Sequence, residues 1–293
     1  MMGEAVLMYG IGAVKAGTSW LFNYLEGHPE CAMPPYKELR YFYMLENDHF
    51  EGQIKKVRVL IADLKDSLET APADRKPLIQ KRLNKTRHWL KVLREQRDDP
   101  AAYAAFMMNE ANGAKLTADI TPEYSMMPVA RLKQMAGVVA NTRFVYLLRD
   151  PLDRLWSNIR MNAWRKTKDL KTMRALALAE VDRILDGKSS PAYERSDYAH
   201  GLSALETAVP EGRRKVMFYE NLFTDDSIRE LCAFLGLSNH KAALDKRIHQ
   251  GVPIKLDAAR RSGLQKLLAP QYHAVEKRFQ TLPARWQDNM ARV

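Results

Sequence analysis

Three short apolar runs along the chain predict buried β-strands. They cover residues 5–9 (AVLMY), 143–148 (RFVYLL) and 215–219 (KVMFY). The first run ends at Gly10, which marks a turn. Short apolar runs bounded by turn or polar residues are typical of strands that are covered on both faces of a sheet. We therefore expect these three segments to lie inside one sheet.

Apolar positions at helical spacing predict helices between and after these strands. The predicted helices cover residues 18–25, the segment that begins with Asp150-Pro151, and residues 227–235 and 270–279. Gly27 and Gly236 suit the ends of the first and third helices. Pro151 and Pro270 suit the first turns of the second and fourth. Because strands alternate with helices, we expect an α/β protein, a P-loop-type three-layer sandwich in which helices flank a central parallel sheet.

The region between the first helix and the second predicted strand has a different character. Residues 31–50 contain two adjacent prolines and look irregular, whereas residues 52–99 are polar with a helical pattern. Nine basic residues and one acid lie between Arg75 and Arg97. A charge run of this kind is typical of a solvated amphipathic helix pair. The alternative is a lid, or a docking surface for an acidic acceptor. We expect one domain over residues 1–293, with a basic helical insertion at about 50–100.

Composition narrows the class of protein only partly. The chain has 293 residues and a formal net charge of +11, which favours anionic partners without choosing among them. Two distant cysteines, Cys31 and Cys232, cannot build a disulfide framework or a zinc cluster, and we expect no metal. The N-terminal apolar run is short and has no basic residue before it, and no stretch reaches transmembrane length. These features predict a cytoplasmic protein.

The first predicted strand runs into a glycine loop with the sequence GIGAVKAGTSW. Gly12 and Gly17 have the spacing of a phosphate loop, but Thr18 stands where nucleotide triphosphatases carry lysine, and the lysine is Lys15 inside the loop. Such a loop can still wrap a tetrahedral anion with backbone N–H groups, hydroxyls and one mobile charge. The displaced lysine counts against an ATPase or kinase. Asp150 could imitate a magnesium ligand, but a role as helix cap explains it. The alternative to a phosphate loop is an ordinary strand-to-helix turn whose glycines bind no ligand.

Two segments carry a family resemblance. VKAGTSWLFNYLEGHPE resembles the 5′-phosphosulfate loop of sulfotransferases that use 3′-phosphoadenosine-5′-phosphosulfate (PAPS), and YLLRDPLDRLWSNIRM resembles their 3′-phosphate motif. KELRYFY and TADITPEYS are similar to segments of the heparan-sulfate branch and its bacterial relatives, and RSDYAHGLSAL and KVMFYENL to later blocks. The similarity touches most of the chain except residues 48–100.

The resemblance implies a role for each matched residue. Lys15 would stabilise the bridging oxygen as it becomes the leaving group, and Glu38 would act as general base on a hydroxyl or amine acceptor. Residues implied to bind the donor are Lys15, Ala16, Gly17, Thr18, Ser19, Trp20, Arg149 and Ser157. PAPS would be the co-substrate and 3′-phosphoadenosine-5′-phosphate (PAP) the product, without a metal. The resemblance also implies that His28 is structural.

The chain departs from the family pattern at one position. Where the heparan-sulfate enzymes carry a lysine before Thr-Pro, this chain has Ile120, so a second cationic stabiliser is missing. Lys37 or an arginine of the basic segment could take its place. Asp119 could support or replace Glu38. The loop that closes over the nucleotide in the family has its best counterpart in residues 249–253.

Two other function classes remain open at this point. A P-loop kinase or phosphotransferase would require Mg²⁺ and ATP, and a basic nucleic-acid-binding protein would explain the charge but not the two phosphate motifs. A catalytically inactive relative is a third possibility, and we expect no nucleic-acid partner. The acceptor could be a carbohydrate, a lipid or a small molecule, bordered by the basic segment and an aromatic cluster. That cluster comprises Tyr36, Tyr41, Phe42 and Tyr43. The sequence does not indicate an oligomeric state.

Overall fold

A four-stranded sheet forms the centre of the protein. The structure is a computed structural model that describes residues 5–95, 100–243 and 254–290. The strands are β1 (Val6–Gly12), β2 (Leu116–Ile120), β3 (Thr142–Leu148) and β4 (Arg214–Phe218). They lie in the order β2-β1-β3-β4 and all pair in parallel. The carboxyl ends of all four strands therefore meet at one edge, where α/β folds place their ligands.

The sheet differs from the sequence prediction at two places. β1 continues past Tyr9 to Gly12, because Gly12 still pairs with Tyr146 of β3 after a register shift. β2 was not predicted, because the polar residues Thr117 and Asp119 interrupt its apolar pattern. Both are fully buried in the structure.

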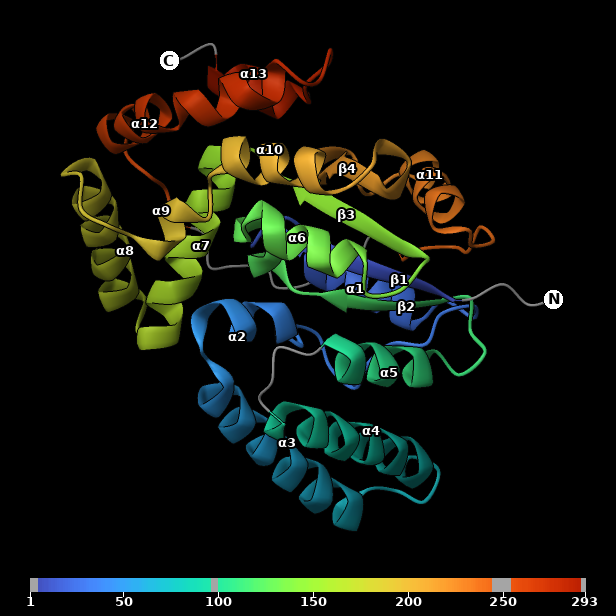
Figure 1. The fold of residues 1–293 in the computed structure, drawn as a ribbon. Coiled ribbons are helices and arrows are strands. Elements are labelled where there is room, and N and C mark those ends of the chain that lie inside the picture. Colours follow the sequence, from blue (N-terminus) through green and yellow to red (C-terminus); the bar gives the residue numbers. More distant parts are fainter. Residues whose placement is uncertain (1–4, 96–99, 244–253, 291–293) are drawn as a thin grey trace.

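Helices cover both faces of the sheet (Figure 1). They are α1 (Thr18–Glu26), α2 (Tyr41–Asn47), α3 (Phe50–Thr70), α4 (Lys76–Arg94), α5 (Pro100–Ala111), α6 (Val129–Ala136), α7 (Pro151–Lys166), α8 (Leu170–Leu185), α9 (Pro191–Glu194), α10 (Tyr198–Ala208), α11 (Asp225–Leu235), α12 (Ala258–Glu276) and α13 (Ala284–Met290). The predicted α/β class, with a parallel sheet between helices, is confirmed. Within the described residues, no helix combines the length and apolar character needed to cross a membrane.

The structure differs from the sequence prediction in two helical segments. The segment expected to be irregular, residues 31–50, contains α2. The last predicted helix was placed from Pro270, whereas α12 begins at Ala258 and holds Pro270 in its interior. The Asp257 side chain starts α12, because its Oδ1 accepts the backbone N–H of Arg260 at 3.0 Å.

The basic segment forms a helical hairpin, as predicted. α3 and α4 pack against each other at the bottom of Figure 1, and α5 lies between this hairpin and β2. α4 turns Leu83, Trp89 and Leu93 inward and leaves most of its charged side chains exposed. The hairpin is held to the body by apolar packing, and Arg82 and Lys85 of α4 add hydrogen bonds to backbone carbonyls of residues 33–35.

Candidate active site

The glycine loop connects the end of β1 to the first turn of α1. Gly17 has a φ of 90°, and a Cβ atom added to it would lie 3.0 Å from the Tyr219 ring, so only glycine fits there. α1 begins at Thr18 without a side-chain cap. The first backbone N–H groups of a helix have no partner within the helix, and together with the helix dipole they attract anions.

The predicted donor-binding residues of this loop differ in what they can offer. Ala16 is fully buried, and Thr18 is 5% exposed at the start of α1. Ser19 is half-buried on the first turn. The Trp20 indole N–H donates to the Ala243 carbonyl at 3.3 Å, and its ring stacks on Tyr24. Trp20 therefore has only its backbone N–H available to a ligand.

The structure brings the two phosphate motifs together. Arg149 follows β3 directly, and its Nη1 donates to the Lys15 carbonyl at 3.0 Å. Its guanidinium lies 4.7 Å above the centre of the Tyr219 ring. The Tyr198 hydroxyl donates to the Arg149 carbonyl at 2.8 Å. Arg149 is therefore fixed from three sides, next to the loop.

Positive charge converges on Lys15. Burial lowers the pKa of Lys15, and so do the nearby charges of Arg149, Arg165, Arg160 and Lys37. Cations are brought this close against mutual repulsion only at a cost in stability, which a bound polyanion offsets. The loop and its surroundings are therefore suited to a ligand with several negative charges.

α7 presents further polar groups to this region. Ser157 is half-buried on α7, and Arg160 lies one turn later on the same face. The helix begins as the sequence predicts, because Asp150 Oδ1 accepts the Asp153 backbone N–H at 2.8 Å. Burial, followed by the charge of Asp153, raises the pKa of Asp150 to about 6. Its other oxygen accepts from the Tyr272 hydroxyl at 2.8 Å, so Asp150 is a structural cap.

Three residues near the loop were missed by the sequence reasoning. Tyr219 carries Arg149 on its ring, and Arg160 adds positive charge beside Lys15. Arg154 is fully buried, and its Nη1 lies 3.4 Å from the Val14 carbonyl. A signal existed for the two arginines, because both share α7 with Ser157. The contact between Tyr219 and Arg149 joins the residue after β3 to the residue after β4. The spacing of residues in the sequence does not predict such a contact.

The predicted base, Glu38, lies in a turn between two cations. Lys37 Nζ is 2.7 Å from Glu38 Oε1, and Arg40 Nη2 is 2.9 Å from Oε2. Burial raises the pKa of Glu38, but the charges of Lys37 and Arg40 outweigh it and bring the pKa below its ordinary value. Arg40 Nη2 also lies 2.7 Å from Oε1 of Glu123. Glu38 is 33% exposed, so an acceptor can reach it.

Asp119 has the opposite environment. It is fully buried, and its carboxylate accepts hydroxyl hydrogen bonds from Thr121 at 2.8 Å, Tyr124 at 2.8 Å and Tyr103 at 3.1 Å. Burial raises the pKa of Asp119 to about 6 despite these bonds. The Thr121 hydroxyl in turn accepts the Arg40 backbone N–H at 3.2 Å. Asp119 is out of reach of an acceptor and supports the turn that carries Glu38.

The position of the missing family lysine is closed. Ile120 is 1% exposed and packs so tightly on β1 that a Cβ on Gly10 would lie 2.9 Å from it. Two kinds of residue could replace the missing lysine. The first, Lys37, lies beside Glu38, and its charge lowers the pKa of Lys15. Arg82, an arginine of the basic segment, instead donates to the Pro35 carbonyl at 2.9 Å. Lys37 is therefore better placed than Arg82.

The structure also bears on the aromatic cluster and on His28. Tyr41 and Phe42 do not border a site, because they are 3% and 0% exposed and pack with Tyr103. His28 is structural, since one ring nitrogen accepts the Glu30 N–H at 3.1 Å and the other lies 3.0 Å from the Ser238 carbonyl. Residues 249–253 lie outside the described residues.

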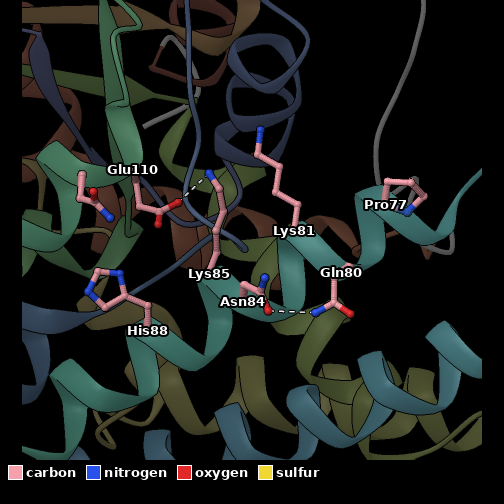
Figure 2. Close-up of a pocket in the computed structure, with 8 residues that line it drawn as sticks. Pro77, Gln80, Lys81, Asn84, Lys85, His88 and Glu110 are labelled. Atoms are coloured by element: carbon pink, nitrogen blue, oxygen red, sulfur yellow. Dashed lines mark hydrogen bonds and ion pairs between the residues drawn. The ribbon is translucent and has the colours of Figure 1, made fainter.

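A separate groove of about 580 Å³ lies between α4 and α5 (Figure 2). All but one of its lining residues carry hydrogen-bonding side chains. They are Pro77, Gln80, Lys81, Asn84, Lys85, His88, Asn109 and Glu110. Lys85 pairs with Glu110 at 2.6 Å and also donates to the Met33 carbonyl at 3.1 Å. The groove contains none of the predicted site residues, but it adjoins the segment that leads to Glu38.

The comparison with protein families agrees with this geometry. The profile of the sulfotransferase family matches residues 9–241. The chain belongs to the sulfotransferase family. The matched region holds the glycine loop, Arg149 and the Glu38 turn of this sulfotransferase. Among curated proteins, none matches the sequence.

Solved structures are similar in fold. A sulfotransferase from Alicyclobacillus acidocaldarius has a TM-score of 0.61 and 19% identity, covering 96% of this chain and 98% of that one. The sulfotransferase domain from the Synechococcus PCC 7002 olefin synthase has a TM-score of 0.49 and 18% identity, covering 98% and 91%. The sulfotransferase domain from the curacin biosynthetic pathway has a TM-score of 0.47 and 17% identity, covering 82% and 76%. The first of these confirms the predicted P-loop-type fold of this sulfotransferase.

Proposed function

We propose that this sulfotransferase takes its sulfuryl group from PAPS and transfers it to a hydroxyl or amine of an acceptor. The observation that carries the donor assignment is the hydrogen bond from Arg149 to the Lys15 carbonyl, which joins the loop suited to the 5′-phosphosulfate to the arginine suited to the 3′-phosphate. A donor with phosphate groups at both ends matches a site with cations at both ends. The kinase hypothesis does not account for this pairing of two cationic segments, and membership of the sulfotransferase family favours sulfuryl transfer.

In the proposed reaction the acceptor attacks sulfur in line with the leaving group. The bond between sulfur and the bridging oxygen of PAPS breaks, a bond between sulfur and the acceptor forms, and PAP leaves. Negative charge grows on the bridging oxygen, and Lys15 stabilises it there together with the N–H groups of Gly17 to Trp20. Ala16 and Thr18 shape the loop, Ser19 adds a hydroxyl, and Arg149 and Ser157 hold the 3′-phosphate.

Glu38 takes the proton that the acceptor loses. Its pKa lies below the ordinary value, so it is ionised and able to accept a proton at neutral pH. Both oxygens are already paired with cations, so an acceptor must displace one of these contacts to reach the base. We assign Lys37 the role of second cation, in place of the lysine that Ile120 replaces.

The acceptor side of the proposal rests on the basic hairpin. α4 contains seven lysines and arginines and no acid, and the groove beside it is lined by amide, ammonium and imidazole groups and by one carboxylate, Glu110, which is paired with Lys85. Such a surface suits an acceptor that already carries negative charge and hydroxyl groups. Exchanging Lys81 for Glu should raise the KM for such an acceptor while leaving PAP affinity unchanged.

PAP release from PAPS tests the reaction directly. We would incubate the protein with PAPS and a panel of carbohydrate, lipid and small aromatic acceptors, and follow PAP by anion-exchange chromatography. Glu38→Gln should slow transfer roughly 10²–10⁴-fold without changing PAP affinity. Glu206→Gln, which removes a carboxylate paired with Arg278 at 2.9 Å, is the matched control. Consumption of ATP with Mg²⁺ but not of PAPS would overturn the proposal.

A further inference from the structure

α7 buries an entire arginine beneath the glycine loop. Arg154 is 0% exposed. Its Nη2 donates to the Ala192 carbonyl at 2.5 Å and to the Ser196 hydroxyl at 2.6 Å. Its Nη1 donates to the Val14 carbonyl and to Asn158 Oδ1, both at 3.4 Å. All four partners are neutral, and within residues 5–95, 100–243 and 254–290 no carboxylate pairs with Arg154.

The charge on this side chain is therefore uncompensated. Burial lowers the pKa of Arg154 to about 10, opposed by the hydroxyls of Tyr198 and Tyr146 and reinforced by the charges of Arg195 and Arg149. A group with that pKa is still protonated at neutral pH. A buried cation without an opposite charge is strongly unfavourable, so such arginines are normally paired.

Arg154 acts on the same loop as Arg149. Arg154 holds the carbonyl of Val14, and Arg149 holds the carbonyl of Lys15, the next residue. Because a trans peptide is planar, its N–H points opposite to its carbonyl, so the Lys15 N–H is directed away from Arg154. The two arginines thus fix the orientation of consecutive peptides at the point where the loop carries its catalytic lysine.

We propose that Arg154 is a positioning residue for the donor, a buried cation that orients the Val14–Lys15 peptide and whose missing counter-charge is supplied by the anion bound in the loop. This inference rests on the proposed function, in which the loop receives the 5′-phosphosulfate. Arg154 does not touch the donor. It acts through the loop backbone and through its electric field, which is strong because the surroundings exclude water.

Two substitutions separate charge from shape. Arg154→Met keeps much of the side-chain volume and removes the charge. Arg154→Lys keeps a charge that becomes titratable, because burial lowers the pKa of a lysine toward the neutral range. The matched control is Arg213→Lys, since among the described residues Arg213 also donates only to neutral carbonyls, those of Thr142 at 3.0 Å and Ala136 at 2.7 Å, at the far edge of the sheet.

The measurement is the dissociation constant of PAP by calorimetry at several pH values between 5.5 and 9. Arg154→Met should bind PAP at least tenfold more weakly than wild type at every pH. Arg154→Lys should bind like wild type at low pH and approach the Met variant as the pH rises and the lysine loses its proton. The PAP affinity of Arg213→Lys should follow that of wild type at every pH. Lys15 titrates in all of these proteins, so only a difference from wild type reports on residue 154.

The outcomes distinguish this inference from the proposed function. If wild type binds PAP and folded Arg154→Met binds it equally well, Arg154 is merely structural and the inference is wrong. A constant ratio between Arg154→Lys and wild type across the pH range, in a folded variant, would also overturn it. If Arg154→Met does not fold, the pH series on Arg154→Lys decides alone. Failure of wild type to bind PAP would refute the proposed donor.

Discussion

Two regions of the molecule concentrate positive charge and use it differently. Around the glycine loop, Lys15, Arg149 and Arg154 are wholly or partly buried, and backbone carbonyls and an aromatic ring hold the two arginines in place. Along α4, Lys81, Arg87 and their neighbours are exposed to solvent. The residue types are the same, but the first group is preorganised and the second is screened by water and salt.

The comparison teaches how to assign function to charge in this fold. A buried cation costs stability unless something opposes it, so its presence indicates a ligand or a structural partner. An exposed cation costs almost nothing, and its presence alone indicates little. The loop therefore supports a specific chemical proposal, whereas α4 supports only a class of acceptor.

The largest effect should come from Lys15. Lys15→Met removes the cation next to the leaving group, and transfer from PAPS should slow about 10²–10³-fold, because the charge that develops on the bridging oxygen loses its stabiliser. PAP affinity should change much less. Lys91→Met, on the exposed face of α4, is the control. If Lys15→Met and Lys91→Met slowed transfer equally, the proposed difference between the two regions would be wrong.

The next effect is on folding. Gly17→Ala should destabilise the protein by about 1–3 kcal/mol, because alanine is strained at a φ of 90° and its Cβ meets the Tyr219 ring. Gly52→Ala in α3 should instead stabilise it by about 0.5–1 kcal/mol, since no atom of the described part of the chain lies within 4 Å of the added Cβ. Urea unfolding of both variants measures the contrast. A harmless Gly17→Ala would mean that the loop is not held as described.

A smaller effect is the pH dependence contributed by Asp119. The folded-state pKa of about 6 lies above the ordinary value of 3.8, so the folded protein binds more protons between these values. Stability therefore falls as pH rises through this window and stays lower above it. Asp119→Asn should reduce the difference in unfolding free energy between pH 4.5 and 7. Part of it should persist, because Asp150 has a raised pKa as well. An unchanged difference would contradict the assignment.

The smallest effect should come from α4. Lys81→Gln should alter PAP affinity less than twofold at 0.15 M salt, because Lys81 is exposed and salt screens the interactions of exposed charges. Calorimetric titration in low and moderate salt checks this. A salt-insensitive loss of affinity would show that the groove and the glycine loop form one site.

The sequence predicted the parts of the fold that local patterns determine. The strands with continuous apolar runs, the cap at Asp150 and the end of α11 at Gly236 were found because each depends on neighbouring residues. β2 was missed because its buried Asp119 is stabilised by hydroxyls of Tyr103 and Tyr124, which a local pattern cannot show. The start of α12 is not predicted correctly, because a proline is typical of a first helical turn, whereas Pro270 lies inside this helix.

The candidate site was predicted as a set of residues but not as an arrangement. Motif resemblance named Lys15, Arg149 and Glu38, whose roles remain proposals. It could not show that Tyr219 supports Arg149, that Lys37 and Arg40 enclose Glu38, or that the arginine of α7 is buried without a carboxylate. These features depend on contacts between distant segments. They determine pKa values and loop geometry, which spacing alone does not encode.

The most direct test of the central claim is PAP binding by wild type and by Arg149→Ala. Thermal unfolding would be followed with PAP, with adenosine-5′-phosphate and with ATP·Mg²⁺. At a hundredfold excess over Kd, a selective ligand stabilises the protein by about 2.7 kcal/mol. The account predicts a clear rise in Tm with PAP, a much smaller one for Arg149→Ala, and none with the other two nucleotides. A rise with ATP·Mg²⁺ alone, or the same rise with PAP in both proteins, would contradict it.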